Sequence, residues 1–190
     1  MRRAAGLALL GMVWAGMALA AVHSATAWRV APGESRVLFD YQRNGKPAQG
    51  HFASFSGHGR FDPTAPADAR LEIRIKSASI DLNDATASAF ATSVDWFDSA
   101  NHPDVVYQLT RLTPEGGNRY RADGDLTIRD TTKPIETTLT LTVENGTAHA
   151  KGSLKLDRTQ YWLGVGPTAL FVDIGHQVSV NFDLIAHPVN

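Results

Sequence analysis

The chain contains no cysteine among its 190 residues. This absence excludes a disulfide scaffold, a thiolate metal site, an iron–sulfur cluster and a cysteine nucleophile. An excess of either charge is also lacking, because 18 basic and 19 acidic side chains give a net charge of -1. Nucleic-acid binders usually carry a strongly basic surface, so we expect no nucleic-acid partner.

The uncharged stretch at the start of the chain is too short to span a membrane. Residues 6–20 carry no charge, but they form a run of only about 15 residues where a bilayer-spanning helix needs roughly 20. The stretch follows Arg2 and Arg3. One Ala-x-Ala site, at 18–20, ends the stretch, and a second, at 25–27, follows it. Such a combination is typical of a cleavable export signal. We therefore predict a signal peptide over residues 1–27, cut after Ala20 or Ala27, and a periplasmic location for one domain formed by residues 28–190.

Alternation of apolar and polar residues recurs along this domain and predicts β-strands. It is clearest in residues 37–42, 71–76, 119–129, 138–143, 148–157 and 177–184. Weaker signals at 28–30, 49–61 and 105–112 bring the expected number to eight or nine strands. The Asn–Gly pairs at 44–45 and 145–146 predict tight turns. One apolar face per strand indicates an antiparallel sheet with one side facing water.

Residues 84–100 depart from this alternation. They are rich in alanine and begin with Asp84, which can cap a helix, as can Ser88. The residue before Pro103 disfavours helical backbone, so we expect one short helix before it.

The strands can form either a closed barrel or a two-sheet sandwich, and alternation alone fits a packed sandwich slightly better. Small residues on the apolar faces favour an open interior instead, and these are Ala122, Gly124, Ala148, Ala150 and Gly152. Trp96, Phe97 and the loop 161–167 either fill the core or cover one mouth of a barrel.

Residues that could perform chemistry are few. The seven histidines show no metal-ligand spacing. His51 and His58 lie an odd number of positions apart on one expected strand, so they face opposite sides unless a bulge or a bend at Gly57 and Gly59 intervenes. No nucleophile elbow, zinc-protease motif or phosphate-binding loop is present. We therefore expect no catalytic residue, no metal and no enzymatic activity.

Short motifs occur in a fixed order over residues 28–186. They are W-R-V at 28–30, S-R-V at 35–37, F-S-G at 55–57, G-R-F-D-P at 59–63, A-S-I-D at 78–81, D-W-F-D at 95–98, H-P at 102–103, G-D-L-T-I at 124–128, T-K-P-I at 132–135, D-R at 157–158, L-G-V-G at 163–166 and I-G-H-Q-V at 174–178. Together they resemble the YceI-like family of secreted, lipocalin-like proteins.

The resemblance implies an all-β, eight-stranded antiparallel, lipocalin-like barrel with one short helix near its mouth. It implies a long apolar pocket that holds a polyisoprenoid, an isoprenoid quinone or a similar long-chain amphiphile, and no other cofactor. Some relatives are associated with stress response, quinone handling or membrane cytochromes. We therefore consider three partners: a membrane or a membrane cytochrome, contacted transiently, and a second copy of the chain in a homodimer.

Two segments depart from the family pattern. The family's helix commonly opens with acidic and histidine residues, where this chain has A-T-A-S-A-F at 85–90. The family's first loop often carries a histidine and glycine motif, where this chain has N-G-K-P-A-Q-G at 44–50. Both segments lie near the expected entrance, so they bear on the identity of the ligand more than on the fold.

Strand parity and the resemblance together select the residues expected to line or close the pocket, with Tyr107, Tyr161 and Trp162 as polar contacts near its mouth. The full set is Val37, Phe39, Tyr41, Phe55, Ile73, Ile75, Trp96, Phe97, Tyr107, Leu126, Ile128, Leu141, Tyr161, Trp162, Val180 and Phe182. Two other functions stay open. One is a periplasmic stress or interaction protein with a packed core and no lipid ligand. The other is an enzyme acting on an amphiphile, which needs a polar cluster inside the barrel.

Overall fold

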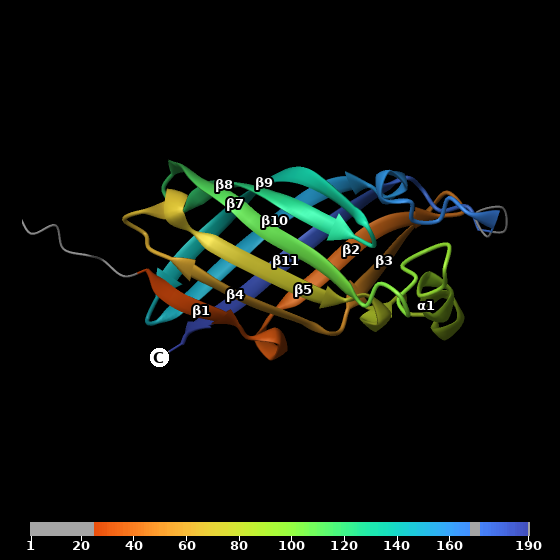
Figure 1. The fold of residues 1–190 in the computed structure, drawn as a ribbon, viewed down its shortest axis with the longest axis horizontal. Coiled ribbons are helices and arrows are strands. Elements are labelled where there is room, and N and C mark those ends of the chain that lie inside the picture. Colours follow the sequence, from red (N-terminus) through yellow and green to blue (C-terminus); the bar gives the residue numbers. More distant parts are fainter. Residues whose placement is uncertain (1–24, 168–171, 190) are drawn as a thin grey trace, which may run out of the picture.

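One antiparallel sheet contains all the strands in residues 25–167 and 172–189, the part of the chain that the computed structural model describes (Figure 1). The strands are β1 (Thr26–Val30), β2 (Arg36–Arg43), β3 (Lys46–Phe52), β4 (Phe55–Phe61), β5 (Arg70–Lys76), β6 (Ile80–Asp81), β7 (Asp104–Gly116), β8 (Arg119–Ile128), β9 (Thr131–Glu144), β10 (Thr147–Asp157) and β11 (Gln177–Pro188). The α-helix α1 spans Ala85–Ala91. Short 3-10 helices are η1 (Pro32–Glu34), η2 (Pro66–Asp68), η3 (Ser77–Ser79) and η4 (Arg158–Tyr161).

The sheet closes on itself because β1 pairs with both β4 and β11. The last strand, β11, also pairs with β2, and β2 pairs with β3. The pairs β1 and β2, β3 and β4, and β5 and β6 therefore each share one strand position, so the segments form an eight-stranded barrel. This arrangement confirms the predicted barrel with one short helix and excludes the sandwich.

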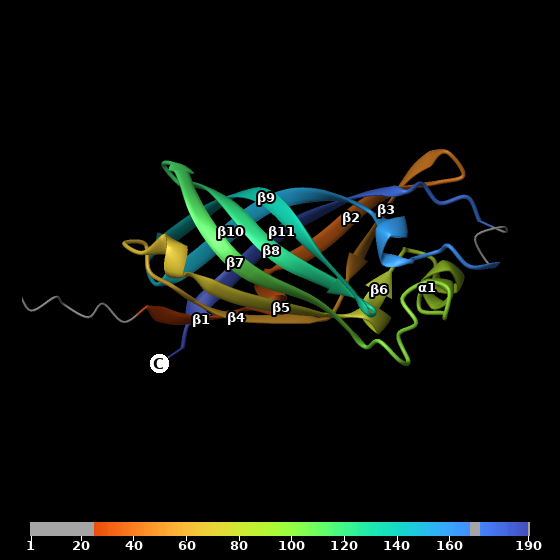
Figure 2. The same cartoon turned by 45° about the horizontal axis from the view of Figure 1, so that its top comes forward.

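The two ends of the barrel differ. One end carries the β2–β3 turn, the segment 82–103 with α1, the β8–β9 turn and the segment between β10 and β11 (Figure 2). We call this end the mouth. The opposite end, where β1 begins and β11 finishes, carries the two-residue β7–β8 and β9–β10 turns and the β4–β5 connection with η2, and we call it the far end.

The segment 49–61, expected as one strand, is broken into β3 and β4 at residues 53–54. The two-residue break shifts the parity, so that Gly50 before it and Phe55 and Gly57 after it are all buried. His51 and His58 alternate with these buried positions, and both therefore lie on the outer face. The expectation that the two histidines face opposite sides is wrong for this reason.

The structure also refines the predicted helix and shows a tight turn after β8. The Asp84 side chain caps α1 by accepting a hydrogen bond from the backbone N–H of Ala87 at 2.9 Å, but the helix ends at Ala91 and turns follow it. The turn after β8 is confined to Arg129 and Asp130, because β9 already begins at Thr131. Arg129 allows this tight turn by adopting a left-handed backbone with a φ of 54°.

Most of the predicted export signal, residues 1–24, lies outside the described residues. Cleavage after Ala27 would cut within β1, where the Ala27 carbonyl accepts a hydrogen bond from the N–H of Val189 at 2.9 Å. Cleavage after Ala20 would leave this strand whole. Among the described residues, none of the helices has the length and apolarity needed to cross a membrane.

Aromatic rings lie over glycines on neighbouring strands inside the barrel. A Cβ atom at Gly152 would lie 2.6 Å from Cζ of Phe182 and 2.9 Å from the backbone oxygen of Thr138. A Cβ at Gly124 would likewise meet the ring of Tyr107 at under 3 Å. These two glycines therefore make room for rings rather than leaving empty volume, which corrects the expectation for them.

We predict that Gly152→Ala destabilises the barrel, because the new methyl group forces Phe182 or the β9 backbone to move. Overpacking of this kind costs about 1–3 kcal/mol. Gly33→Ala is the matched control, since a Cβ there meets nothing within 4 Å. Urea unfolding of both variants measures the difference, and equal free energies of unfolding would contradict the prediction.

Candidate functional site

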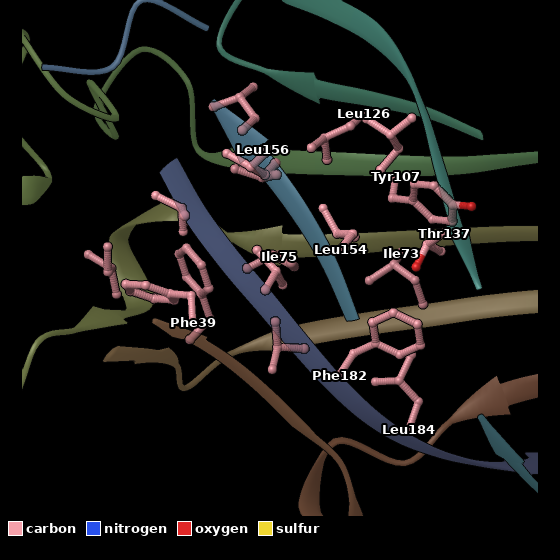
Figure 3. A pocket seen from close by; sticks show the side chains of 18 of the residues that line it. Phe39, Ile73, Ile75, Tyr107, Leu126, Thr137, Leu154, Leu156, Phe182 and Leu184 are labelled. Atoms are coloured by element: carbon pink, nitrogen blue, oxygen red, sulfur yellow. The ribbon is translucent and has the colours of Figure 1, made fainter. Parts of the chain in front are cut away.

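The barrel encloses a cavity of about 480 Å³. Side chains from every strand and from α1 line it, and nearly all of them are apolar (Figure 3). The volume lies within the range of about 300–1,000 Å³ that is usual for small-molecule sites. The inward-facing alternate residues of each strand therefore surround a dry space large enough for a ligand.

The cavity runs along the barrel from the mouth towards the far end. Leu82 and Phe90 contribute at the mouth, whereas Trp28, Phe61 and Leu71 contribute towards the far end. An elongated apolar chamber of this shape suits a ligand with a long hydrocarbon chain better than a compact polar metabolite.

Most of the predicted lining residues do line the cavity. They are Val37, Phe39, Tyr41, Ile73, Ile75, Trp96, Phe97, Tyr107, Leu126, Ile128, Leu141, Val180 and Phe182. The small residues Ala122, Ala148 and Ala150 line it as well, as expected from their size. For the residues on strands, the agreement between prediction and structure follows from alternation, because every second residue of a barrel strand faces inward.

Three predicted residues, Phe55, Tyr161 and Trp162, are not among the lining residues. Phe55 is buried in a cluster with Val30 and Ile73. Tyr161 is buried within η4, whereas Trp162 adopts a left-handed backbone with a φ of 60° and leaves 65% of its surface exposed. The fold of the segment after β10, which no alternation pattern describes, decides the positions of Tyr161 and Trp162.

Sequence reasoning missed the lining contributed by α1 and, although it considered the loop 161–167 as a cover for the mouth, it did not identify Leu163 and Ile174 as lining residues. Ala87, Phe90 and Ala91 of α1 line the cavity, and so do Leu163 and Ile174 of the loop after β10. The three helical residues have the i, i+3, i+4 spacing of one helix face, which was a usable signal. The loop residues carry no such signal, because their placement depends on contacts made by Arg158.

The buried side chain of Arg158 binds several backbone carbonyls of the segment between β10 and β11, at the mouth. Its guanidinium donates hydrogen bonds to the backbone carbonyls of Gly175 at 3.0 Å, Ile174 at 2.6 Å and Gly164 at 3.1 Å, and to that of Leu163. It also lies 5.2 Å from the ring centroid of Trp96. Burial lowers the pKa of Arg158, while the negative charge of nearby carboxylates opposes this shift. Charge-assisted hydrogen bonds thus hold the loop over the cavity.

Four of the described residues that line the cavity carry hydroxyl groups, Tyr41, Thr86, Tyr107 and Thr137, and Figure 3 shows those of Tyr107 and Thr137. Thr137 donates a hydrogen bond to the backbone carbonyl of Ser153 at 2.7 Å. The hydroxyl of Tyr107 is buried and has no hydrogen-bond partner among the described residues. Burial, with a smaller contribution from Asp123 and Asp125, raises the pKa of Tyr107 to about 12.

No histidine, aspartate or glutamate lies among the described residues that line the cavity. His51 instead lies on the outer face, 3.9 Å from a carboxylate oxygen of Asp81. Nor do the described parts of the chain group three or more histidine or carboxylate side chains as metal ligands would require. The polar groups of the described lining are instead hydroxyls and the guanidinium groups of Arg43, Arg60, Arg70 and Arg158.

Comparison with known proteins agrees with this geometry. The family model of the YceI-like domain matches residues 28–186. The chain belongs to the YceI-like family. Two relatives are UPF0312 proteins, from Photorhabdus laumondii (29% identical over 133 residues, 66% of this chain and 69% of the relative) and from Pseudomonas fluorescens (29% over 138 residues, 66% and 70%).

Solved structures share the fold of this YceI-like chain. BcnA of Burkholderia cenocepacia superposes with a TM-score of 0.76 at 27% identity, covering 82% of this chain and 98% of BcnA. A polyisoprenoid binding domain from Saccharophagus degradans, implicated in plant cell wall breakdown, superposes with a TM-score of 0.70 at 14% identity, covering 86% and 99%. At that identity the second likeness concerns the fold alone.

We predict that Tyr107→Phe leaves the free energy of unfolding unchanged or raises it, because the hydroxyl it removes makes no hydrogen bond. Thr137→Val is the matched control inside the same cavity. It removes a hydrogen bond that is made and should destabilise the protein by about 1 kcal/mol. Urea unfolding compares the two, and a loss of stability in Tyr107→Phe as large as in Thr137→Val would contradict the prediction.

Alkaline pH gives a second prediction for Tyr107. Its pKa is raised from 10.0 to about 12 in the folded protein, so the unfolded chain releases this proton first. The contribution to stability is therefore complete below pH 10.0 and is lost as the pH rises through about 12. Stability measured across this range should fall less steeply in Tyr107→Phe than in the unchanged protein, and identical slopes would refute the assignment.

Proposed function

We propose that the protein is an exported, periplasmic carrier that holds a polyisoprenoid, an isoprenoid quinone or a similar long-chain amphiphile inside its barrel. The observation that carries the proposal is the elongated apolar cavity of about 480 Å³, with its almost wholly hydrocarbon lining. The role proposed is binding and transport rather than catalysis.

The physical reason is the free energy of removing hydrocarbon from water. Each methylene group that leaves water contributes about 0.8 kcal/mol, so a chain of ten contributes about 8 kcal/mol. The cavity is already formed by the closed sheet, and little of this free energy is spent on ordering the protein. An amphiphile of this kind stabilises the barrel in turn, because it binds only the folded state.

Two further observations support the proposal. The neighbour from Saccharophagus degradans with the same fold is described as a polyisoprenoid binding domain. The predicted signal over residues 1–27 would place the carrier outside the cytoplasm. There a long-chain amphiphile that leaves a membrane needs an apolar compartment to keep its hydrocarbon chain out of water. The alternative of an interaction protein without a ligand rested on a packed core, which the cavity does not favour.

Filling the cavity tests the proposal. We predict that Ala150→Trp, on the inner face of β10, abolishes uptake of a long-chain quinone, because the indole occupies the space of the ligand. Lys151→Trp adds the same side chain to the exposed face of the same strand and should bind as the unchanged protein does. Ala150→Leu, a smaller addition, covers the case in which Ala150→Trp does not fold.

Native mass spectrometry before and after organic extraction measures the bound ligand, and circular dichroism checks the fold of each variant. An unchanged protein that is purified without an apolar ligand and takes up no long-chain quinone from detergent would overturn the proposal. Equal uptake by the Ala150 variants and by Lys151→Trp would also overturn it, because the ligand would then lie elsewhere.

A further inference from the structure

Large exposed apolar side chains gather at the mouth. Val94 and Trp162 each leave 65% of their surface exposed, and Val165 leaves 44%. They come from two loops, one following α1 and the other following η4 (Figure 2). The other described residues of this kind, Val143 and Val189, come from the last part of β9 and from the residue after β11, both at the far end. We call Val94, Trp162 and Val165 the apolar rim.

Hydrogen bonds hold the two loops of the apolar rim side by side. The N–H of Gly164 donates to the backbone carbonyl of Asp95 at 2.7 Å. Nη1 of Arg129 donates to the carbonyl of Trp96 at 3.3 Å and to that of Trp162 at 3.4 Å. Arg129 therefore bridges both loops from the β8–β9 turn, and the loops that carry the rim residues lie side by side.

The two loops of the apolar rim also contribute to the lining of the cavity. Trp96 lies two residues after the exposed Val94, Leu163 directly follows the exposed Trp162, and both Trp96 and Leu163 line the cavity. The ring of Trp96 approaches Gly164 so closely that a Cβ there would lie 2.5 Å from it. The same two loops therefore carry both lining residues of the cavity and exposed apolar residues at the mouth, with the Asp95 carboxylate between the loops, close to Gly166.

We propose that the apolar rim docks into the interface of a lipid bilayer, so that cargo passes between the membrane and the barrel without crossing water. The inference rests on the proposed carrier function. A bilayer fits this surface because tryptophan prefers the boundary between hydrocarbon and water. Clustered exposed apolar residues on a soluble fold also mark interaction sites, and this cluster adjoins the space that would receive a membrane-derived chain.

Charge does not explain the docking. Arg43 and Arg129 lie near the mouth, but the carboxylates of Asp84, Asp95 and Asp130 lie there too, and Arg43 is 4.0 Å from that of Asp84. Charges of both signs give little net attraction to an anionic surface. The rim should therefore bind zwitterionic vesicles, and the binding should depend weakly on salt, because apolar contact carries it.

Flotation with phosphatidylcholine vesicles tests the inference. The variant Val94→Ser, Trp162→Ser, Val165→Ser should lose about tenfold or more of its partition into vesicles, since it removes the apolar surface that enters the interface. Val143→Ser, Val189→Ser is the matched control at the far end and should float as the unchanged protein does. All variants are purified after export in the same way, so any contribution of residues 1–27 is common to them.

The readouts separate this inference from the carrier function. Both variants should take up a long-chain quinone from detergent micelles as the unchanged protein does, whereas only the rim variant should extract it slowly from vesicles. Equal flotation of the rim variant and the unchanged protein would overturn the inference while leaving the carrier function intact. An unchanged protein that floats but takes up no quinone from micelles would instead overturn the carrier function.

A second copy of the chain is the competing occupant. Sedimentation velocity without vesicles decides this, because an unchanged protein that dimerises and a rim variant that is monomeric would assign the apolar rim to a dimer interface and overturn membrane docking. A monomer in both cases, with vesicle binding lost in the rim variant, is the result that we expect.

Discussion

Pairing of β1 with β11 is the constraint on which the rest of the structure depends, because it joins the first strand to the last. Trp28, Arg29 and Val30 lie opposite Pro188, His187 and Ala186, and β1 also pairs with β4. With this pairing β1 and β11 are no longer free edges of the sheet. Closure also separates inside from outside, so that alternation along each strand becomes an apolar lining and a polar outer face.

The closed sheet would not by itself determine the shape of the interior. Aromatic rings do so by lying over glycines of neighbouring strands, as Phe39 does over Gly50 and Phe182 does over Gly152. The rings take up part of the interior and leave the remainder as a continuous chamber. Tyr107 packs against three separate clusters of buried residues, so its ring joins the mouth half of the core to the far half.

The mouth differs from the far end because of one buried cation. Arg158 binds backbone carbonyls of its own loop and faces Trp96, which belongs to the loop after α1. The same two loops line the cavity on one side and expose the apolar rim on the other. We thus propose that one face of this pair of loops contacts the long-chain cargo and the other face contacts a membrane. Arg158 and Arg129 hold the two loops in place.

By itself the sequence determined what depends on neighbours along the chain: the strands, the Asn–Gly turns, the Asp84 helix cap and a set of inward-facing residues, of which 13 of the 16 predicted do line the cavity. These follow from periods of two and from local capping chemistry. Only the tertiary structure decided that the sheet closes, that Gly124 and Gly152 accommodate rings, and that Phe55, Tyr161 and Trp162 lie away from the cavity. Each of these depends on groups from strands or loops distant in sequence, and alternation carries no information about such partners.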